Sequence, residues 1–241
     1  IIADEYGNTV ALGERDCSMQ RRNQKVLEES PSPLMTPELR DAMQKAAVAA
    51  AKACGYCNAG TIEFLVDHER NFYFMEMNTR IQVEHPVTEW VTGIDWVQTQ
   101  LRIAQGEPLP FTQEDITLRG HAIECRINAE NPDCNFRPSP GTIQALHLPG
   151  GMGVRIDSAI YQGYTIPPYY DSMIAKLIVH APTRKEAIQK MRWALSEFLV
   201  DGVETNIDFQ LRLLKTEAFE QGTYDNAFLM HWLEDSKHKQ S

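Results

Sequence analysis

The chain has 241 residues, of which 43% are apolar and 23% are charged, and its formal net charge is −10. These values are typical of a globular protein with one large domain or two smaller ones. The acidic balance argues against nucleic acid or an anionic membrane as the main partner, and no apolar run approaches the roughly 20 residues of a membrane span. The five cysteines are scattered and odd in number, which favours reduced thiols in a cytoplasmic protein.

The chain begins with two short segments that predict a hairpin, Ile1–Ala3 and Thr9–Leu12, joined by a loop that contains Gly7 and Asn8. A cationic segment, Glu14–Glu29, follows in this otherwise acidic protein. One interpretation is a generic charged surface, and the other is an anion subsite. The side chains that would form such a subsite are Arg15, Arg21, Arg22 and Lys25, with neutral hydrogen bonds from Gln20 and Asn23.

An Ala-rich helix is expected next, because Thr36 can cap it and Pro37 suits its first position. The helix should end near Cys54, since Gly55 follows.

The next two segments, Thr61–Asp67 and Phe72–Asn78, predict a β-hairpin around a polar loop. If the four loop residues close it symmetrically, Glu63 faces Glu76, and Leu65 faces Phe74. Asn78 lies two residues beyond Glu76 and therefore shares its side of the sheet.

Two opposed carboxylates repel each other unless one is protonated or a cation lies between them. A hard divalent ion such as Mg²⁺ binds carboxylate and amide oxygens, and Glu63, Glu76 and Asn78 supply that set. A solvated strand face with two glutamates is the alternative.

The segment Thr79–His85 alternates polar and apolar residues, so an extended conformation would project Arg80, Gln82 and Glu84 to one side. The arginine would bind a small planar anion bidentately, and the carboxylate would accept a proton. An exposed polar edge is the alternative. A divalent-ion site followed by an anion clamp and a base is a rarer chance pattern, and it favours the functional interpretation.

A second part of the chain begins after the proline-containing stretch Glu107–Leu118, which predicts a linker. Its first strand, 120–130, places Glu124, Arg126 and Asn128 on one side. Arg126 stands on an otherwise apolar strand, which favours a partly buried, functional guanidinium over a surface residue. A strand, Met173–His180, and a helix with a capping box at Thr183 follow.

Five segments carry a resemblance to a known family: ERDCSMQRRNQK (14–25), FMEMNTRIQVEHPVTE (74–89), GHAIECRINAE (120–130), RPSPG (137–141) and PPYYDSMIAKL (167–177). The chain resembles biotin carboxylase, an ATP-grasp enzyme, along nearly its whole length. The string MNTRIQVEHPVTE is highly specific to the biotin-dependent carboxylases.

The resemblance implies an α+β fold. An ATP-grasp C-terminal subdomain (1–107), an antiparallel sheet with helices that holds the metal and bicarbonate site, would precede the β-rich biotin carboxylase C-terminal domain (108–233) and a flexible tail (234–241). It also implies ATP-dependent carboxylation of biotin by bicarbonate through carboxyphosphate, with Mg²⁺ or Mn²⁺. This would be the first half-reaction of acetyl-CoA carboxylase in fatty acid synthesis. The implied partners are biotin carboxyl carrier protein, carboxyltransferase subunits and a second copy in a homodimer.

The resemblance assigns roles to individual residues. The implied metal ligands are Glu63, Glu76 and Asn78. The implied bicarbonate ligands are Arg80, Gln82, the backbone of Val83 and, nearby, Lys25. Glu84 would deprotonate bicarbonate, and Arg126 would stabilise the biotin enolate. The implied nucleotide contacts are Gln20, Asn23 and Leu65.

The sequence departs from the family pattern in two respects. Many members have His at the position of Asn23, and an amide can bind a nucleotide hydroxyl but carries no charge. The family's N-terminal domain and glycine-rich ATP lid have no counterpart in this sequence, which resembles the C-terminal half. We therefore expect weak or no ATP-dependent turnover by this chain alone.

Three alternatives remain open from the sequence. The chain could act as another ATP-grasp ligase that joins a carboxylate to an amine. It could be the biotin carboxylase domain of a larger pyruvate or propionyl-CoA type carboxylase. It could also be a non-catalytic dimerisation module, in which case Mg²⁺ would not bind at Glu63 and Glu76.

Overall fold

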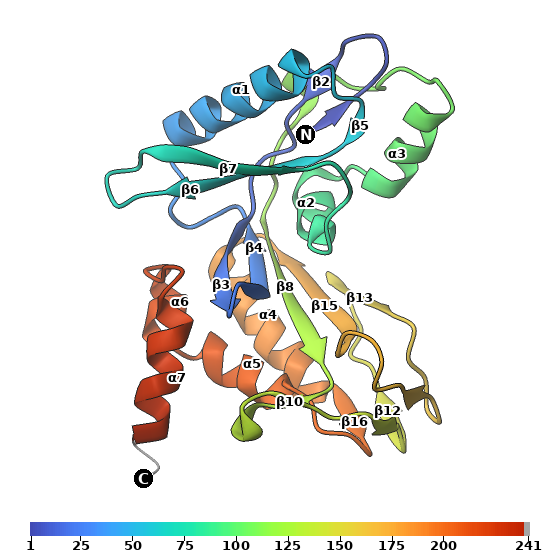
Figure 1. Cartoon of the computed structure of the whole chain (residues 1–241), viewed down its shortest axis with the longest axis vertical. Helices are drawn as coiled ribbons and strands as arrows, with labels where there is room; N and C mark the ends of the chain where they lie inside the picture. The colour runs from blue at the N-terminus through green and yellow to red at the C-terminus, as the bar shows by residue number, and fades with distance from the viewer. Residues whose placement is uncertain (239–241) are drawn as a thin grey trace. The chain divides into compact units, whose positions relative to one another are not determined.

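The protein is described by a computed structural model that covers residues 1–238, with side chains to residue 235 (Figure 1). The chain forms two compact units. Unit 1 comprises residues 1–15 and 30–119, and unit 2 comprises residues 16–29 and the chain from Gly120. The sequence placed a single boundary at residue 107, with residues 16–29 in the first part. That segment joins unit 2 because it forms two strands of the unit 2 sheet, a long-range pairing that has no local signature.

Unit 1 contains a small sheet of short strands, the longer β6–β7 hairpin and three α-helices (Figure 1). Its elements are β1 (Ile2–Ala3), β2 (Thr9–Val10), α1 (Pro37–Ala53), β5 (Asn58–Ala59), β6 (Thr61–Val66), β7 (Phe72–Asn78), α2 (His85–Thr92), α3 (Trp96–Ala104) and the 3₁₀ turn η1 (Gln113–Asp115). The first hairpin is confirmed, since β1 pairs antiparallel with β2.

Helix α1 lies along one side of the β6–β7 hairpin (Figure 1). Its predicted cap is confirmed: the Thr36 hydroxyl accepts from the Leu39 amide at 3.2 Å. The small side chains of Ala47 and Ala51 let the helix pack against Ile62 and Phe64 of the hairpin. The opposite face of the hairpin is thereby left to the polar residues of the candidate site.

Unit 2 is built on a five-stranded sheet of order β13-β15-β8-β4-β3. The sheet strands are β3 (Asp16–Arg21), β4 (Gln24–Ser30), β8 (His121–Asn128), β13 (Val154–Ser158) and β15 (Met173–Ala181). The remaining elements are β9 (Glu130–Asn131), η2 (Pro132–Cys134), β10 (Arg137–Pro138), β11 (Gly141–Thr142), β12 (Ala145–His147), β14 (Thr165–Ile166), α4 (Arg184–Glu197), β16 (Leu199–Asp201), α5 (Ile207–Leu214), α6 (Glu217–Gln221) and α7 (Phe228–His238).

The sheet of unit 2 has two unlike faces because β8 alternates as its sequence predicts. Ile123, Cys125 and Ile127 point into the core with residues of α4. Glu124 and Arg126 alternate with them and point to the other face. Helix α4 begins with the predicted capping box, in which Thr183 and Glu186 bond to each other's backbone.

Helix α7 continues to His238, past residue 234, where we expected a polar tail to begin. Residues 239–241 of that expected tail lie outside the described residues. None of the helices that the structure describes has the length and apolar character needed to cross a membrane.

Candidate active site

The β6–β7 hairpin of unit 1 sets Glu63 opposite Glu76, as predicted. The rest of the predicted register is wrong, because Leu65 faces Tyr73 and Phe64 faces Phe74. The turn contains one residue more than expected, which shifts the pairing of the two strands by one residue. A bulge between Glu63 and Phe64 shifts the pairing back. A bulge leaves one extra residue on one strand, so the two departures cancel at the glutamate pair.

The two carboxylates are held around one nitrogen atom. The Nδ2 atom of Asn78 donates to Oε1 of Glu63 at 3.1 Å and to Oε1 of Glu76 at 2.9 Å. The amide NH₂ thus occupies the place that a cation would take between two acids. Hard oxygen donors on both sides fit Mg²⁺ or Mn²⁺. Among the side chains that the structure describes, residues 1–235, no group of three or more His, Cys, Asp or Glu could hold a metal ion. An ion here would therefore draw further ligands from amide oxygens, water or a bound phosphate.

The segment after the hairpin is not extended, contrary to our expectation. The chain turns at Val83 and Glu84, and helix α2 begins at His85 with Pro86 near its start. Proline suits the first turn of a helix. Because Pro86 lies in the first turn of α2, the chain bends into the helix at Val83 and Glu84, although the alternation of residue types predicted an extended segment up to His85. Gln82 and Glu84 are therefore 6% and 2% exposed, respectively, and do not share an exposed edge with Arg80.

Arg80 lies next to the acid pair instead of projecting away from it. Its Nη2 atom donates to Oδ1 of Asn78 at 3.1 Å, and its Nη1 atom donates to the carbonyl of Ile81. The side chain is exposed, so its guanidinium can reach an anion from solvent.

Gln82 connects the acid pair to a residue that the sequence placed elsewhere. Its Nε2 atom donates to Oε1 of Glu63 at 2.7 Å, and its Oε1 atom accepts from Nη2 of Arg15 at 2.5 Å. Arg15 had been grouped with Arg21 and Lys25, but it belongs to unit 1 and they belong to unit 2. Arg15 and Gln82 are 67 residues apart in the sequence, so no local pattern could predict this hydrogen bond.

Arg126 lies in unit 2 on the polar face of β8, and its side chain is 18% exposed. The predicted partial burial of this guanidinium is confirmed. Its Nε atom donates to Oε1 of the fully buried Glu28 at 2.7 Å, and Nη2 lies 2.5 Å from the same oxygen. A charge-assisted contact of this kind fixes the side-chain direction.

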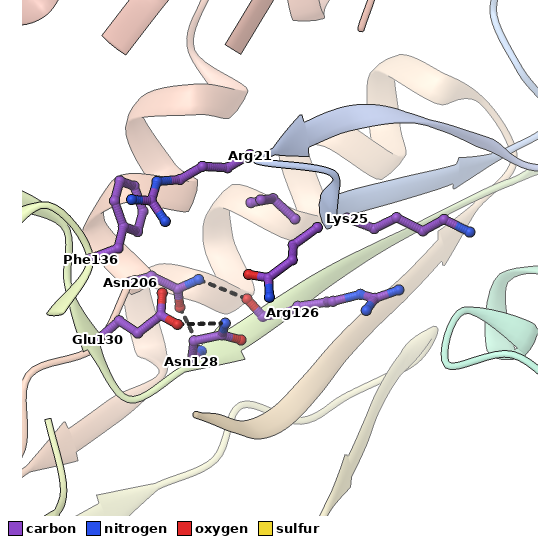
Figure 2. A pocket seen from close by; sticks show the side chains of 9 residues that line it. Arg21, Lys25, Arg126, Asn128, Glu130, Phe136 and Asn206 are labelled. Atoms are coloured by element: carbon purple, nitrogen blue, oxygen red, sulfur yellow. Dashed lines mark hydrogen bonds between the residues drawn. The ribbon is translucent and has the colours of Figure 1, made fainter. Parts of the chain in front are cut away.

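Lys25 and Arg126 line the same pocket in unit 2 (Figure 2). They come from the neighbouring strands β4 and β8 and extend in the same direction. The other lining residues are Arg21, Gln24, Val26, Asn128, Glu130, Phe136 and Asn206. The sequence did not place Phe136, Asn206 or Glu130 in a site. Glu130 begins β9, Phe136 follows η2, and Asn206, which the sequence suggests only as a helix cap, precedes α5.

The wall of this pocket is tied together by amides and an aromatic contact (Figure 2). Asn206 donates to the carbonyl of Arg126 at 2.9 Å and accepts from the backbone of Asn128 at 2.8 Å. The guanidinium of Arg21 lies 4.0 Å from the ring centre of Phe136. Burial, and secondarily the charge of Arg22, lowers the pKa of Arg21. The pocket is lined by three basic side chains, Arg21, Lys25 and Arg126, and one carboxylate, Glu130.

The three expected nucleotide contacts occupy different places. Gln20 bonds to the carbonyl of Cys17 at 2.8 Å, and Asn23 is exposed in the turn between β3 and β4, both in unit 2. Leu65 lies in unit 1 on β6 and is 47% exposed. Gln20 and Asn23 do not line the pocket of Figure 2.

Comparisons with known proteins cover nearly the whole chain. The ATP binding domain of the carbamoyl-phosphate synthase L chain matches residues 1–112, and the biotin carboxylase C-terminal domain matches residues 124–231. Biotin carboxylase 1 of Bacillus subtilis (strain 168) is 60% identical, over 95% of this chain and 51% of its own length. A pyruvate carboxylase subunit of Methanothermobacter thermautotrophicus is 57% identical, over 95% of this chain and 46% of its own length.

A solved structure agrees with these matches. The biotin carboxylase domain dimer of the 2-oxoglutarate carboxylase from Hydrogenobacter thermophilus, in complex with MgADP, ADP and bicarbonate, has a TM-score of 0.94 and 52% identity. The match covers 95% of this chain and 51% of that chain. The chain thus spans about half the length of the relatives that it matches. Its mixed helices and antiparallel sheets match the ATP-grasp biotin carboxylases in fold, and the chain is homologous to biotin carboxylases over nearly its whole length.

Proposed function

We propose that this chain supplies the metal, bicarbonate and biotin residues of an enzyme that carboxylates biotin with bicarbonate at the expense of ATP. The observation that carries the proposal is the glutamate pair of the hairpin, with Asn78 between the carboxylates and Arg80 bonded to Asn78. Similarity to a biotin carboxylase domain solved in complex with MgADP and bicarbonate supports the same chemistry.

Unit 1 would handle the phosphates and bicarbonate. Glu63, Glu76 and Asn78 would hold the divalent ion, which supplies charge screening for the nucleotide phosphates when it is bound. Arg80 would clamp the planar anion, and Glu84 would take its proton, so that the bicarbonate oxygen can attack the γ-phosphate. Preorganised donors favour such a step because charge develops on the transferring oxygens.

Unit 2 would handle biotin. Carboxyphosphate would break down to CO₂ and phosphate beside the ureido ring, and Arg126 would stabilise the negative charge on the ureido oxygen. The contact with Glu28 holds this guanidinium in one direction. Lys25 lines the same pocket and would add positive charge for the bicarbonate. Gln20, Asn23 and Leu65 would contact the nucleotide.

For the wider setting we propose the first half-reaction of acetyl-CoA carboxylase in fatty acid synthesis, in the cytoplasm, with biotin carboxyl carrier protein and carboxyltransferase subunits as partners and a homodimer as the assembly. Relatives named only as biotin carboxylases support this setting. The 57% identity to a pyruvate carboxylase subunit favours pyruvate as a second candidate acceptor.

The decisive experiment measures ATP cleavage by the protein that contains this sequence, with bicarbonate and free biotin each added or withheld. We expect cleavage that requires bicarbonate and rises with biotin. Cleavage that needs neither would contradict the proposal and favour another ATP-grasp ligase. Transfer of labelled carboxylate to acetyl-CoA or to pyruvate, with the matching carboxyltransferase, would then identify the acceptor.

A further inference from the structure

Arg15 lies behind the candidate bicarbonate site in unit 1 and donates its side-chain hydrogen bonds to neutral groups. Its Nη2 atom donates to Oε1 of Gln82 at 2.5 Å and to Oγ1 of Thr61 at 3.1 Å. Its Nη1 atom donates to Oγ1 of Thr88 at 3.1 Å, and the guanidinium lies 5.5 Å from the Trp96 ring centre. Three acceptors on separate elements hold the arginine in one position, and its positive charge stays available to the site.

The arginine decides which way the amide of Gln82 points. A guanidinium has only donors, so it must face the carbonyl oxygen of the amide. The NH₂ group is then directed to Oε1 of Glu63, 2.7 Å away. A flipped amide would set NH₂ against the donors of Arg15 and the carbonyl oxygen against a carboxylate. Both contacts would be repulsive, and Gln82 is 6% exposed, so little water is available to relieve them.

To bind an anion, Gln82 must present its NH₂ group as a hydrogen-bond donor. It does so only in the observed orientation, in which the amide oxygen faces Arg15. Since an amide offers either its NH₂ or its oxygen on a given side, free rotation would present an acceptor to bicarbonate part of the time. The charge of Arg15 would also favour an anion nearby, because donors and charges fixed in advance cost no reorganisation.

We propose that Arg15 is a positioning residue, which fixes the amide of Gln82 as a donor and raises the affinity of the site for bicarbonate. The inference rests on the proposed function for its substrate, whereas the orientation of the amide can be tested on this chain by itself.

The test compares Arg15→Met with Arg40→Met. Arg40 is a partly buried arginine of the same unit, 26% exposed, and it forms an ion pair with Glu14 at 2.6 Å that does not touch the site. We expect Arg15→Met to raise the KM for bicarbonate by about tenfold, the effect of losing one hydrogen bond to a charged group. The KM for ATP should change less than about twofold, and Arg40→Met should leave both values unchanged. Arg15→Lys keeps the positive charge but has a single donor nitrogen in place of the planar fork, so it should restore part of the bicarbonate affinity.

The second readout is the side-chain NH₂ signal of Gln82 in a ¹H–¹⁵N correlation spectrum of this chain, identified by its loss in Gln82→Glu. We expect a slowly exchanging pair of protons that broadens or exchanges faster in Arg15→Met and stays unchanged in Arg40→Met.

Equal kinetic effects of Arg15→Met and Arg40→Met, or an unaltered Gln82 signal in Arg15→Met, would overturn the inference. Failure of the unsubstituted protein to cleave ATP in response to bicarbonate would refute the proposed function instead. In that case the amide signal alone would still decide whether Arg15 sets the orientation of Gln82.

Discussion

Nη2 of Arg80 donates to Oδ1 of Asn78 at 3.1 Å, so the arginine engages the amide oxygen that we assign to a metal ion. The same amide directs its NH₂ to the two opposed glutamates. A divalent ion between the carboxylates would displace this NH₂ group and attract the oxygen. Metal binding is therefore expected to rotate the amide and to release Arg80 towards bicarbonate.

The first prediction concerns the acid pair. Glu76→Gln removes one of the two proposed carboxylate ligands and should weaken Mn²⁺ binding by at least about 100-fold, since the loss of outer-shell partners alone costs up to about 100-fold. Calorimetry or the electron paramagnetic resonance signal of free Mn²⁺ measures the affinity. The control, Glu69→Gln, removes the same charge from the exposed loop of the same hairpin and should leave Mn²⁺ binding unchanged. Equal affinities in the two variants would rule out a metal site at Glu76.

The second prediction concerns Asn78 as a substitute for a cation. Asn78→Asp replaces the NH₂ donor by a third carboxylate and should lower the free energy of unfolding of unit 1 by about 1–3 kcal/mol without metal. Added Mg²⁺ should restore more stability than it adds to the unsubstituted chain, because a ligand that binds only the folded state stabilises it. Urea unfolding with and without Mg²⁺ measures both effects.

Asn71→Asp is the matched control for this change. Nδ2 of Asn71 donates to Oδ2 of Asp67 at 3.0 Å in the loop of the same hairpin, so the substitution also creates a like-charge pair. It should destabilise the hairpin, but Mg²⁺ should not reverse the loss. Recovery of both variants to the same extent would indicate unspecific screening.

The third prediction is an acid-dependent loss of stability in unit 2 that comes from Glu29. The carboxylate is fully buried and accepts hydrogen bonds from Arg184 at 2.7 Å and from Tyr224 at 2.5 Å, with Nε2 of His121 at 2.5 Å. Burial alone raises its pKa, but the hydrogen bonds from His121 and Arg184, together with their charges, outweigh burial. The pKa is therefore lowered from 4.5. Asp16 is a further charged group near this cluster.

A carboxyl group whose pKa is lower in the folded state than in the unfolded state stabilises the protein fully when the pH is above its pKa in the unfolded state. This stabilisation is lost as the pH falls through its pKa in the folded state. The free energy of unfolding of unit 2 should thus fall below pH 4.5. Glu29→Gln should be less stable at pH 7 by about 3–5 kcal/mol, because Arg184 loses its buried counter-charge, and its stability should fall less steeply in acid. Urea unfolding at a series of pH values measures this, and parallel curves for the two proteins would contradict it.

The fourth prediction concerns Asn23. Arg22 and Asn23 have φ angles of 50° and 62° and form a two-residue turn between β3 and β4, the type I′ geometry in which asparagine is favoured. Asn23→Ala should lower the free energy of unfolding of unit 2 by about 1 kcal/mol, and Asn23→Gly should not. Urea unfolding measures the difference. If Asn23 also contacts a nucleotide, Asn23→Gly will weaken ATP binding at unchanged stability.

The sequence alone determined the local parts of this protein. Alternation along β6 and β7, with a short polar loop, was enough to predict the hairpin, but Glu63 faces Glu76 only because a longer turn and a bulge offset each other. The caps at Thr36 and Thr183 located two helices for the same reason: the groups that interact are neighbours in the chain. The segment after the hairpin was mistaken for a strand because the two-residue alternation continued into the start of α2.

Only the tertiary structure decided the long-range contacts that prepare the site. Residues 16–29 joined the sheet of unit 2, Arg15 reached Gln82 across 67 residues, and Glu28 reached Arg126 across 98 residues. Each of these contacts depends on how separate elements pack, and packing is set by the summed burial of many side chains. Residue spacing records which groups face the same side of one element, but it does not record which element will lie against it.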